Sequence, residues 1–381
     1  MDAQTSSSVT DRDLHEHLHS LWAADAQAAI ATIVGVEGSA YRRPGAKLVA
    51  PADSEPLGAI TAGCLDGPIE TLTTQARRSD TVTSERFDLT GENWGIGRGC
   101  NGVIDLIVEP LDDSIEPLLQ ALDRGSSAAV LTVTQSDDEA VPIGARTVLT
   151  SVGVTSGEDR APVPADALSE LQSTAEAARE AGSTTLASVS RDTGDIRVFI
   201  DGIQPAPELL LFGAQQDVNV IADFGVRAGF RVTVASPRGA QSDPEQFPQA
   251  HRVCATHPTE IASAVEIPER TYAVVLSHNL VDDRLALETL LTETAVPYIG
   301  LMGPRKRFEA LREEAGVDDR TFTEAELARI STPVGLNLGE GSLTGIGMSV
   351  VSEVLAVANG ADGGRLSDHS GPIHPRSNPS P

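Results

Sequence analysis

The apolar residues of the chain follow two different patterns on either side of a proline-rich stretch, DGIQPAPE, at 201–208. Before it, short apolar runs typical of strands alternate with turns and with stretches of helical spacing. Strands are expected at 29–36, 46–51, 103–111, 128–134, 145–151 and 185–190, and helices at 12–25, 66–78, 113–124 and 165–182. This pattern predicts an amino-terminal α/β domain over residues 12–202.

After the proline-rich stretch, continuous apolar strands alternate with helices. Strands are expected at 209–212, 231–235, 252–255, 272–277 and 298–302, and helices from about 216 to 229 and at 282–293, 304–315, 323–329 and 344–359. Strands of this kind are typical of a parallel sheet covered on both faces, so residues 207–360 are predicted to form a Rossmann-like doubly wound domain. Residues 361–381 are rich in Gly, Ser and Pro and are predicted to form a disordered tail.

The amino-terminal domain contains an internal echo. AAIATI at 28–33 resembles AAVLTV at 128–133, and PGAK at 44–47 resembles IGAR at 143–146. The two offsets, 100 and 99 residues, are nearly the same. This favours two related halves, of which only the first carries a cysteine turn.

The charge of the chain is strongly acidic, with 55 acidic against 28 basic residues and a net charge of −27. Only Lys47 and Lys306 are lysines. Such a halophile-like surface suits a salt-rich cytoplasm, and it argues against nucleic acid as a partner because phosphate contacts need a basic face. There is no apolar run long enough to span a membrane and no basic, apolar leader at the amino terminus. We therefore expect a soluble, cytoplasmic protein without a membrane partner.

Both lysines lie in basic clusters beside glycine turns. Arg42, Arg43 and Lys47 surround a Pro44-Gly45 turn, and a second cluster, Arg305-Lys306-Arg307, follows GLMGP, which contains Gly303. Cations at a glycine turn or a helix start favour a phosphate or pyrophosphate. The alternative is a set of salt bridges to the acidic surface, but the coincidence with glycine turns favours an anionic ligand.

Two of the three cysteines lie in glycine-rich segments, Cys64 in GAITAGCLDG and Cys100 in GIGRGCNG. Small neighbours leave the sulfur accessible and the backbone free to adopt positive φ. A thiolate near an arginine or a helix start is a soft metal ligand or a sulfur carrier. The alternative is that small residues occur here because space is tight. Cys254 lies within a predicted strand and is expected to be inert.

The second domain has an incomplete dinucleotide motif. GAQQDV at 213–218 follows the first strand, where a pyrophosphate meets a helix start in NAD(P) enzymes. Gln215 replaces the second glycine of that motif, and Ala235-Ser236 stand where an acid would hold the ribose. A Rossmann fold without this cofactor is favoured, and an NAD(P)-dependent oxidoreductase is kept as the alternative function. A nucleotide-binding regulatory module without chemistry is a third hypothesis.

A second ligand-facing group is expected at the end of a later strand of this domain. Ser277-His278-Asn279 close that strand, and Asp283 follows five residues after His278. In doubly wound sheets this edge faces the ligand. His278 is therefore a candidate for orienting a ligand or transferring protons, or else merely a histidine at a strand end.

From about residue 12 to 360 the sequence resembles the xanthine dehydrogenase accessory protein family, also called XdhC/CoxI. The stretches that carry the resemblance are GSAYRRPGAKLV, AITAGCLDG, GRGCNGVIDLIVEP, PIGAR, LLLFGAQQDV, LSHNLVDD, YIGLMGPRKRFEAL and TPVGLNLGEGSLTGIGMSVVSEVLAVANG. The resemblance implies a maturation factor for molybdenum hydroxylases rather than a catalyst. Such a factor binds molybdenum cofactor, protects it during sulfuration and passes it to the apo-enzyme.

The resemblance also implies partners and site residues. The partner is a molybdenum hydroxylase apo-enzyme, and the chain either sulfurates the cofactor itself or recruits a cysteine desulfurase. Cys64 is the expected molybdenum contact, with Cys100 second. The remaining expected cofactor-binding residues are Asp66, Arg42, Arg43, Lys47, Gly213, His278, Asp283, Gly303, Arg305 and Lys306. We expect a homodimer, the commonest oligomeric state.

The sequence departs from the family pattern at three places. The family commonly has Gly-His or Gly-Asp where this chain has Gln215-Gln216, and an acid where it has Ala235-Ser236. A Pro-Glu-Glu near the last helix is replaced by Gly345-Ile346-Gly347. These changes weaken the case for a dinucleotide and leave the expected amino-terminal site untouched.

Overall fold

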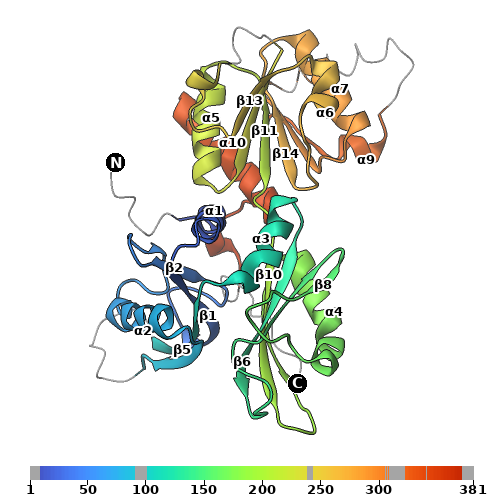
Figure 1. The fold of residues 1–381 in the computed structure, drawn as a ribbon. Helices are drawn as coiled ribbons and strands as arrows, with labels where there is room; N and C mark the ends of the chain where they lie inside the picture. Colours follow the sequence, from blue (N-terminus) through green and yellow to red (C-terminus); the bar gives the residue numbers. More distant parts are fainter. Residues whose placement is uncertain are drawn as a thin grey trace. The chain divides into compact units, whose positions relative to one another are not determined.

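The computed structural model describes residues 9–90, 101–237, 243–304, 306, 308, 322–339 and 341–370. It divides into two compact units, the first ending at Pro205 and the second beginning at Ala206 (Figure 1). Among the described residues, none of the helices has the length and apolar character needed to cross a membrane.

The first unit contains the same succession of elements twice. The first half consists of α1 (Asp11–Ala23), β1 (Ala28–Ser39), β2 (Lys47–Pro51), β3 (Leu57–Gly58), α2 (Asp66–Ser79), β4 (Thr83–Asp88) and β5 (Asn101–Pro110). The second half begins with a 3-10 turn (Asp113–Ile115) that runs into α3 (Glu116–Asp123), and continues with β6 (Ala128–Ser136), β7 (Arg146–Thr150), β8 (Gly153–Thr155), α4 (Ala165–Ala181), β9 (Thr184–Val189) and β10 (Ile196–Ile203). The sheet orders, β3-β2-β1-β5-β4 and β8-β7-β6-β10-β9, correspond strand by strand.

The correspondence extends to single hydrogen bonds. In each half the same strand residue exchanges backbone hydrogen bonds with the turn before the next strand: Ile33 with Gly45 and Ala46, and Val133 with Gly144 and Ala145. Both glycines have left-handed φ values, +94° and +88°, which favour glycine. The short sequence echo therefore coincides with a repeated backbone structure.

Alternating residues of each sheet pack to opposite sides. One side of the first sheet forms a core with α2, and one side of the second sheet forms a core with α4 (Figure 1). The other sides share a third core with α1 and α3, in which Ile30 and Val49 of the first half meet Val130 and Val148 of the second. This shared core holds the two halves together and positions the polar groups between them.

The second unit is built on a six-stranded parallel sheet of order β13-β12-β11-β14-β15-β16. Its strands are β11 (Glu208–Phe212), β12 (Arg231–Ser236), β13 (Arg252–Ala255), β14 (Thr271–Val275), β15 (Tyr298–Leu301) and β16 (Ile330–Ser331). In chain order this is 3-2-1-4-5-6, the order typical of Rossmann folds. The predicted fold class, α/β with a doubly wound second domain, is confirmed.

Helices cover both faces of this sheet (Figure 1). α5 (Gln216–Arg227) and α10 (Leu343–Ala358) pack on one face, and α7 (Leu280–Glu293) with the short α6 (Ile261–Ala264) on the other. The short α9 is Glu324–Leu327. Of the helix expected at 304–315, only Lys306 and Phe308 are described as helical.

Two segments differ from their predicted roles. The stretch 201–208 is predicted to separate the domains, but Asp201 to Ile203 belong to β10 and are buried. Of the expected tail, residues 361–370 are exposed and contain a 3-10 turn, Leu366–Asp368. Residues 371–381 lie outside the described residues.

Candidate functional site

Cys64 lies in the turn immediately before α2. The side chain is half-buried and packs against the core between the first sheet and α2. Gly63 before it has φ +102°, and Leu65 after it is fully buried, with its N–H donating to Thr61 Oγ1 at 3.2 Å. Leu65, the N-cap residue, makes no side-chain capping bond, and Asp66 is exposed as the first residue of the helix. The thiol therefore sits at a helix start, where backbone N–H groups favour anions.

A second loop of the first half presents two arginines. Arg42 and Arg43 lie between β1 and β2, and Arg43 is exposed. Within the part of the chain that the structure describes, neither side chain has an ion pair or hydrogen bond. Ala40 and Ala46, at the two ends of this loop, pack against the same core as Cys64. The loop and the cysteine turn thus share one hydrophobic support.

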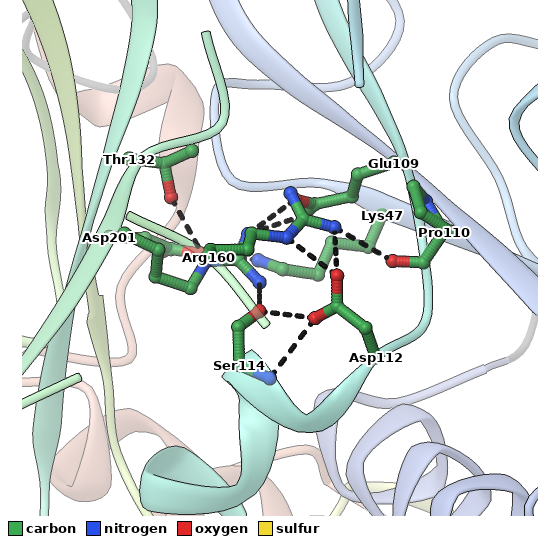
Figure 2. Close-up of polar contacts among 9 residues, drawn as sticks. Lys47, Glu109, Pro110, Asp112, Ser114, Thr132, Arg160 and Asp201 are labelled. Carbon is green, nitrogen blue, oxygen red and sulfur yellow. Dashed lines mark hydrogen bonds and ion pairs between the residues drawn. The ribbon is translucent and has the colours of Figure 1, made fainter. Parts of the chain in front are cut away.

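Lys47 is not directed to the surface of this loop. Its ammonium group pairs with Asp201 on β10 of the second half and donates to Gly45 O at 3.1 Å (Figure 2). Thr184, at the start of β9, also donates to Pro44 O at 3.5 Å. Lys47 therefore fixes the turn to the second half.

A matching ion pair runs in the opposite direction. Arg146 occupies the position in β7 that Lys47 occupies in β2, since each pairs in register with a threonine of the neighbouring strand. Its guanidinium group meets Glu109 of β5 at 2.5 and 2.6 Å. Glu109 and Asp201 are also equivalent, because they pair with Ile30 and Val130 in register. Each half therefore supplies a cation to the buried acid of the other.

Further groups complete this cluster around Glu109 (Figure 2). Arg160 contacts Glu109 at 2.8 Å and Asp112 at 2.6 Å, and Arg146 donates to Ser114 Oγ at 3.2 Å. Burial raises the pKa of Glu109, but Arg146 and Arg160 outweigh it, so the pKa is held below its ordinary value. The carboxylate is charged and saturated with partners.

The interior of this cluster leaves little room. Burial, together with the charge of Lys47, lowers the pKa of His15 to about 4, so this ring is neutral near pH 7. The cavity between the halves measures about 40 Å³, close to the volume of one water molecule. We therefore assign the cluster of Lys47, Asp201, Arg146, Glu109, Arg160 and Asp112 to joining the halves and not to holding a ligand.

The repeat separates structural residues from residues of special chemistry. At the offset that matches Gly45 with Gly144, the charge of Lys47 is kept as Arg146, but Arg42 and Arg43 correspond to Val141 and Pro142. The structural cation is present in both halves, whereas the two unpaired arginines are confined to the first.

The same comparison applies to the cysteine. The buried faces of the equivalent helices α2 and α4 match at an offset of 102 residues, as Ile69, Thr73 and Ala76 against Leu171, Ala175 and Ala178. At that offset Cys64 corresponds to Asp166, which pairs with Arg191 at 2.7 Å. An ion pair thus stands in the second half where the first half has a thiol.

At the carboxyl edge of the second sheet, the start of α5 is occupied by side chains. The Gln215 amide accepts a hydrogen bond from Ala214 N at 3.1 Å and donates to Ser277 O at 3.2 Å. Gly213 is required, because a Cβ atom would lie 2.6 Å from Leu276 O. Gln215 thus stands where the second glycine would admit a pyrophosphate, and the acid Asp217 lies in the first turn of α5.

The other residues expected at this edge are partly brought together. His278 Nε2 lies 2.6 Å from Asp217 Oδ2, and the buried Asp283 accepts a hydrogen bond from Ser277 N at 2.9 Å. Gly303 has φ +121°, and Lys306 is exposed. Arg305 and Cys100 lie outside the described residues.

Sequence reasoning missed the acids of the inter-half cluster and Asp217. The available signal was the presence of single charged residues within otherwise apolar strands, Glu109 and Asp201, at matching places in the two halves. Among the described residues no three His, Cys, Asp or Glu side chains are grouped so as to hold a metal ion. A metal-bearing ligand of the first half would therefore meet the single sulfur of Cys64.

Comparison with known proteins gives matches in both units. The model of the XdhC and CoxI family matches residues 21–88, within the first half, and the model of the XdhC Rossmann domain matches residues 209–354. A Bacillus subtilis (strain 168) protein, described as a probable component of xanthine dehydrogenase, is 27% identical over 350 residues, which cover 90% of this chain and 97% of the relative.

Two further relatives extend these matches. The uncharacterized Escherichia coli (strain K12) protein YqeB is 30% identical over 185 residues, 48% of this chain but 32% of YqeB. A crystal structure described as a xanthine dehydrogenase from Bacillus halodurans superposes with a TM-score of 0.71 at 22% identity, covering 91% of this chain and 96% of that one, and so has the same fold. Since the two family models match in the order of the two units, the chain belongs to the XdhC and CoxI family.

Proposed function

We propose that this chain is an accessory protein for a xanthine dehydrogenase-type molybdenum hydroxylase, and that it binds molybdenum cofactor and assists its sulfuration and insertion. Family membership and the descriptions of the relatives support a role in this system. The observation that carries the cargo assignment is the asymmetry of the repeat. An accessible thiol and two unpaired arginines occur in the first half, and an ion pair and apolar residues replace them in the second.

The residues of the first half fit the chemistry of this cargo. Molybdenum with sulfur ligands is soft, and a thiolate such as that of Cys64 is a soft ligand. The phosphate of the pterin needs charged donors, which Arg42 and Arg43 supply without first breaking an ion pair. Lys47 holds the loop through Gly45 O and Asp201, so it positions the arginines rather than binding the phosphate.

An NAD(P)-dependent oxidoreductase is less well supported. A pyrophosphate at the start of α5 would meet the Gln215 side chain and approach the carboxylate of Asp217. Both oppose an anion at a helix start that is open in dinucleotide-binding proteins. The cargo role explains the first-half residues, which the oxidoreductase role leaves without a function.

The double variant Arg42→Gln, Arg43→Gln is expected to bind molybdenum cofactor at least about tenfold more weakly than the parent, because charge-assisted hydrogen bonds to the phosphate are lost. The affinity is measured by anaerobic titration with isolated cofactor, and the molybdenum content per chain is measured after co-expression with a cofactor-producing host. The effect should shrink as salt concentration rises, since exposed charges are screened.

The matched control is Arg124→Gln, Arg227→Gln, which makes the same change in net charge at two exposed arginines far from the loop in sequence. This control is expected to bind like the parent. Equal affinity for the parent and the Arg42, Arg43 variant would remove the phosphate assignment, and the absence of cofactor binding by the parent would remove the proposed function.

A further inference from the structure

The carboxyl edge of the second sheet contains a crevice position independent of the first unit. β11 and β14 are neighbours, and the helices that follow them, α5 and α7, pack on opposite faces of the sheet. In open α/β sheets ligands bind where the strand order reverses in this way. Gly213 follows β11 at this point, and His278 follows β14.

His278 is held in an unusual backbone conformation. Its φ is +58°, which is uncommon for a residue other than glycine. The residues on both sides are fixed: Ser277 donates from N and Oγ to Asp283 Oδ1 at 2.9 and 2.5 Å, and Asn279 Oδ1 accepts from Val281 N at 2.9 Å to cap α7. Strained residues kept in place by such contacts occur preferentially at functional sites.

The imidazole of His278 forms a dyad with a carboxylate. Asp217 Oδ2 lies 2.6 Å from Nε2, and the acid side chain is 10% exposed while the ring is 50% exposed. The carboxylate favours a proton on Nε2, which leaves the lone pair on Nδ1. Nδ1 has no partner among the residues that the structure describes. A half-exposed ring oriented by a buried acid is the usual arrangement of a general base.

The surroundings define the class of ligand. The Gln215 side chain fills the phosphate position, and the acids Asp217 and Asp282 lie in the first turns of α5 and α7. A phosphorylated ligand is therefore disfavoured at the start of α5. Gln216, the first residue of α5, is exposed and its amide has no partner among the described residues. An amide offers both a donor and an acceptor, which suits a heterocycle with a lactam edge.

We propose that the second unit binds an uncharged heterocycle with a lactam N–H, the class shared by purines and pterins, and that His278 Nδ1 accepts its proton. The ligand N–H bond breaks, an N–H bond forms at Nδ1, and the electron pair stays on the ligand as the lactam anion. Asp217 balances the charge of the imidazolium. His278 is the residue that touches the ligand, and Asp217 is its positioning residue.

Titration of the full chain with guanosine and with pterin tests the proposal and distinguishes the two sources of the lactam. At least one probe is expected to bind, and its N-methylated analogue, 1-methylguanosine or the corresponding methylpterin, is expected to bind about tenfold more weakly because the donor is lost. Failure of both probes to bind at millimolar concentration, or equal affinity for the methylated analogue, would overturn the proposal.

Variants assign the effect to the dyad. His278→Asn should weaken binding of the preferred probe about tenfold while keeping the fold, because asparagine tolerates positive φ. Asp217→Asn should move the nitrogen-15 shifts of the His278 ring away from the Nε2–H tautomer, a change that a purely structural role would not predict. Asp282→Asn is the control for loss of a nearby acid. Unchanged probe affinity in a folded His278→Asn protein would contradict the assignment.

Discussion

Replacing Glu109 by glutamine is expected to destabilise the first unit by about 3–5 kcal/mol, because it leaves Arg146 and Arg160 buried without their shared carboxylate. The side chains of Glu109, Arg146 and Arg160 are 5%, 8% and 6% exposed. Water therefore does not replace the lost charge. Urea unfolding at constant salt, followed by a probe in the first unit, measures the change.

The control for Glu109 is Glu37→Gln, which removes an exposed acid paired with Arg86 at 2.7 Å. Exposed ion pairs contribute about 0–1 kcal/mol, so this variant should unfold almost like the parent. The Glu109 variant should also lose the acid-dependent part of the unfolding free energy. Because the folded pKa is below the ordinary value, that contribution is present above pH 4.5 and is lost as the pH falls through the folded pKa. Similar free energies for both variants would show that the inter-half cluster does not stabilise the unit.

Glu208→Gln is expected to stabilise the second unit at pH 8 by about 3 kcal/mol. Glu208 begins β11, and burial raises its pKa from 4.5 to about 7 despite a hydrogen bond from Thr233. Its charged form is thus disfavoured in the folded state. The stability due to this group is fully present below pH 4.5 and is lost as the pH rises through 7.

The difference in unfolding free energy between parent and Glu208 variant, measured at several pH values from 4.5 to 8, tests this expectation. It should be close to zero at pH 4.5, grow through pH 6 and level off above 7. Asp223→Asn on the exposed surface of α5 is the control and should give a difference that does not change with pH. A flat difference for Glu208 would contradict the raised pKa.

The sequence pattern was sufficient for the order and type of most elements because their apolar positions are regular. It failed for the end of β10, because Asp201 and Gly202 resemble turn residues and so indicate a linker. Both have tertiary reasons: Asp201 pairs with Lys47, and a Cβ atom on Gly202 would lie 1.9 Å from Ala178 O. It also missed β4, a largely polar edge strand that is paired with β5 alone.

The candidate site shows a similar division. The glycine turn and the two arginines were predicted from local sequence, and the structure leaves those arginines without partners among the described residues. The role of Lys47 was not predictable, because its partner Asp201 is 154 positions away. Local sequence shows that a cation follows a turn, but the fold decides whether that cation meets a ligand or a buried acid.

The repeated architecture gives these assignments a physical basis. Equivalent charged residues that appear in both halves, Lys47 with Arg146 and Asp201 with Glu109, join the halves in a reciprocal way. Residues that differ between equivalent positions, such as Cys64 and Asp166, are free of that structural requirement. The chemistry confined to the first half therefore reflects what that half binds.

The most direct test is the affinity of Cys64→Ser for sulfurated molybdenum cofactor under anaerobic conditions, with Cys254→Ser as the control. Cys254 lies half-buried in β13, and burial raises the pKa of its thiol, so its removal should leave affinity unchanged. We expect the Cys64 variant to bind more weakly than both the parent and the Cys254 variant, because it lacks the soft ligand. Equal affinity of all three proteins would contradict the role of the first-half thiol.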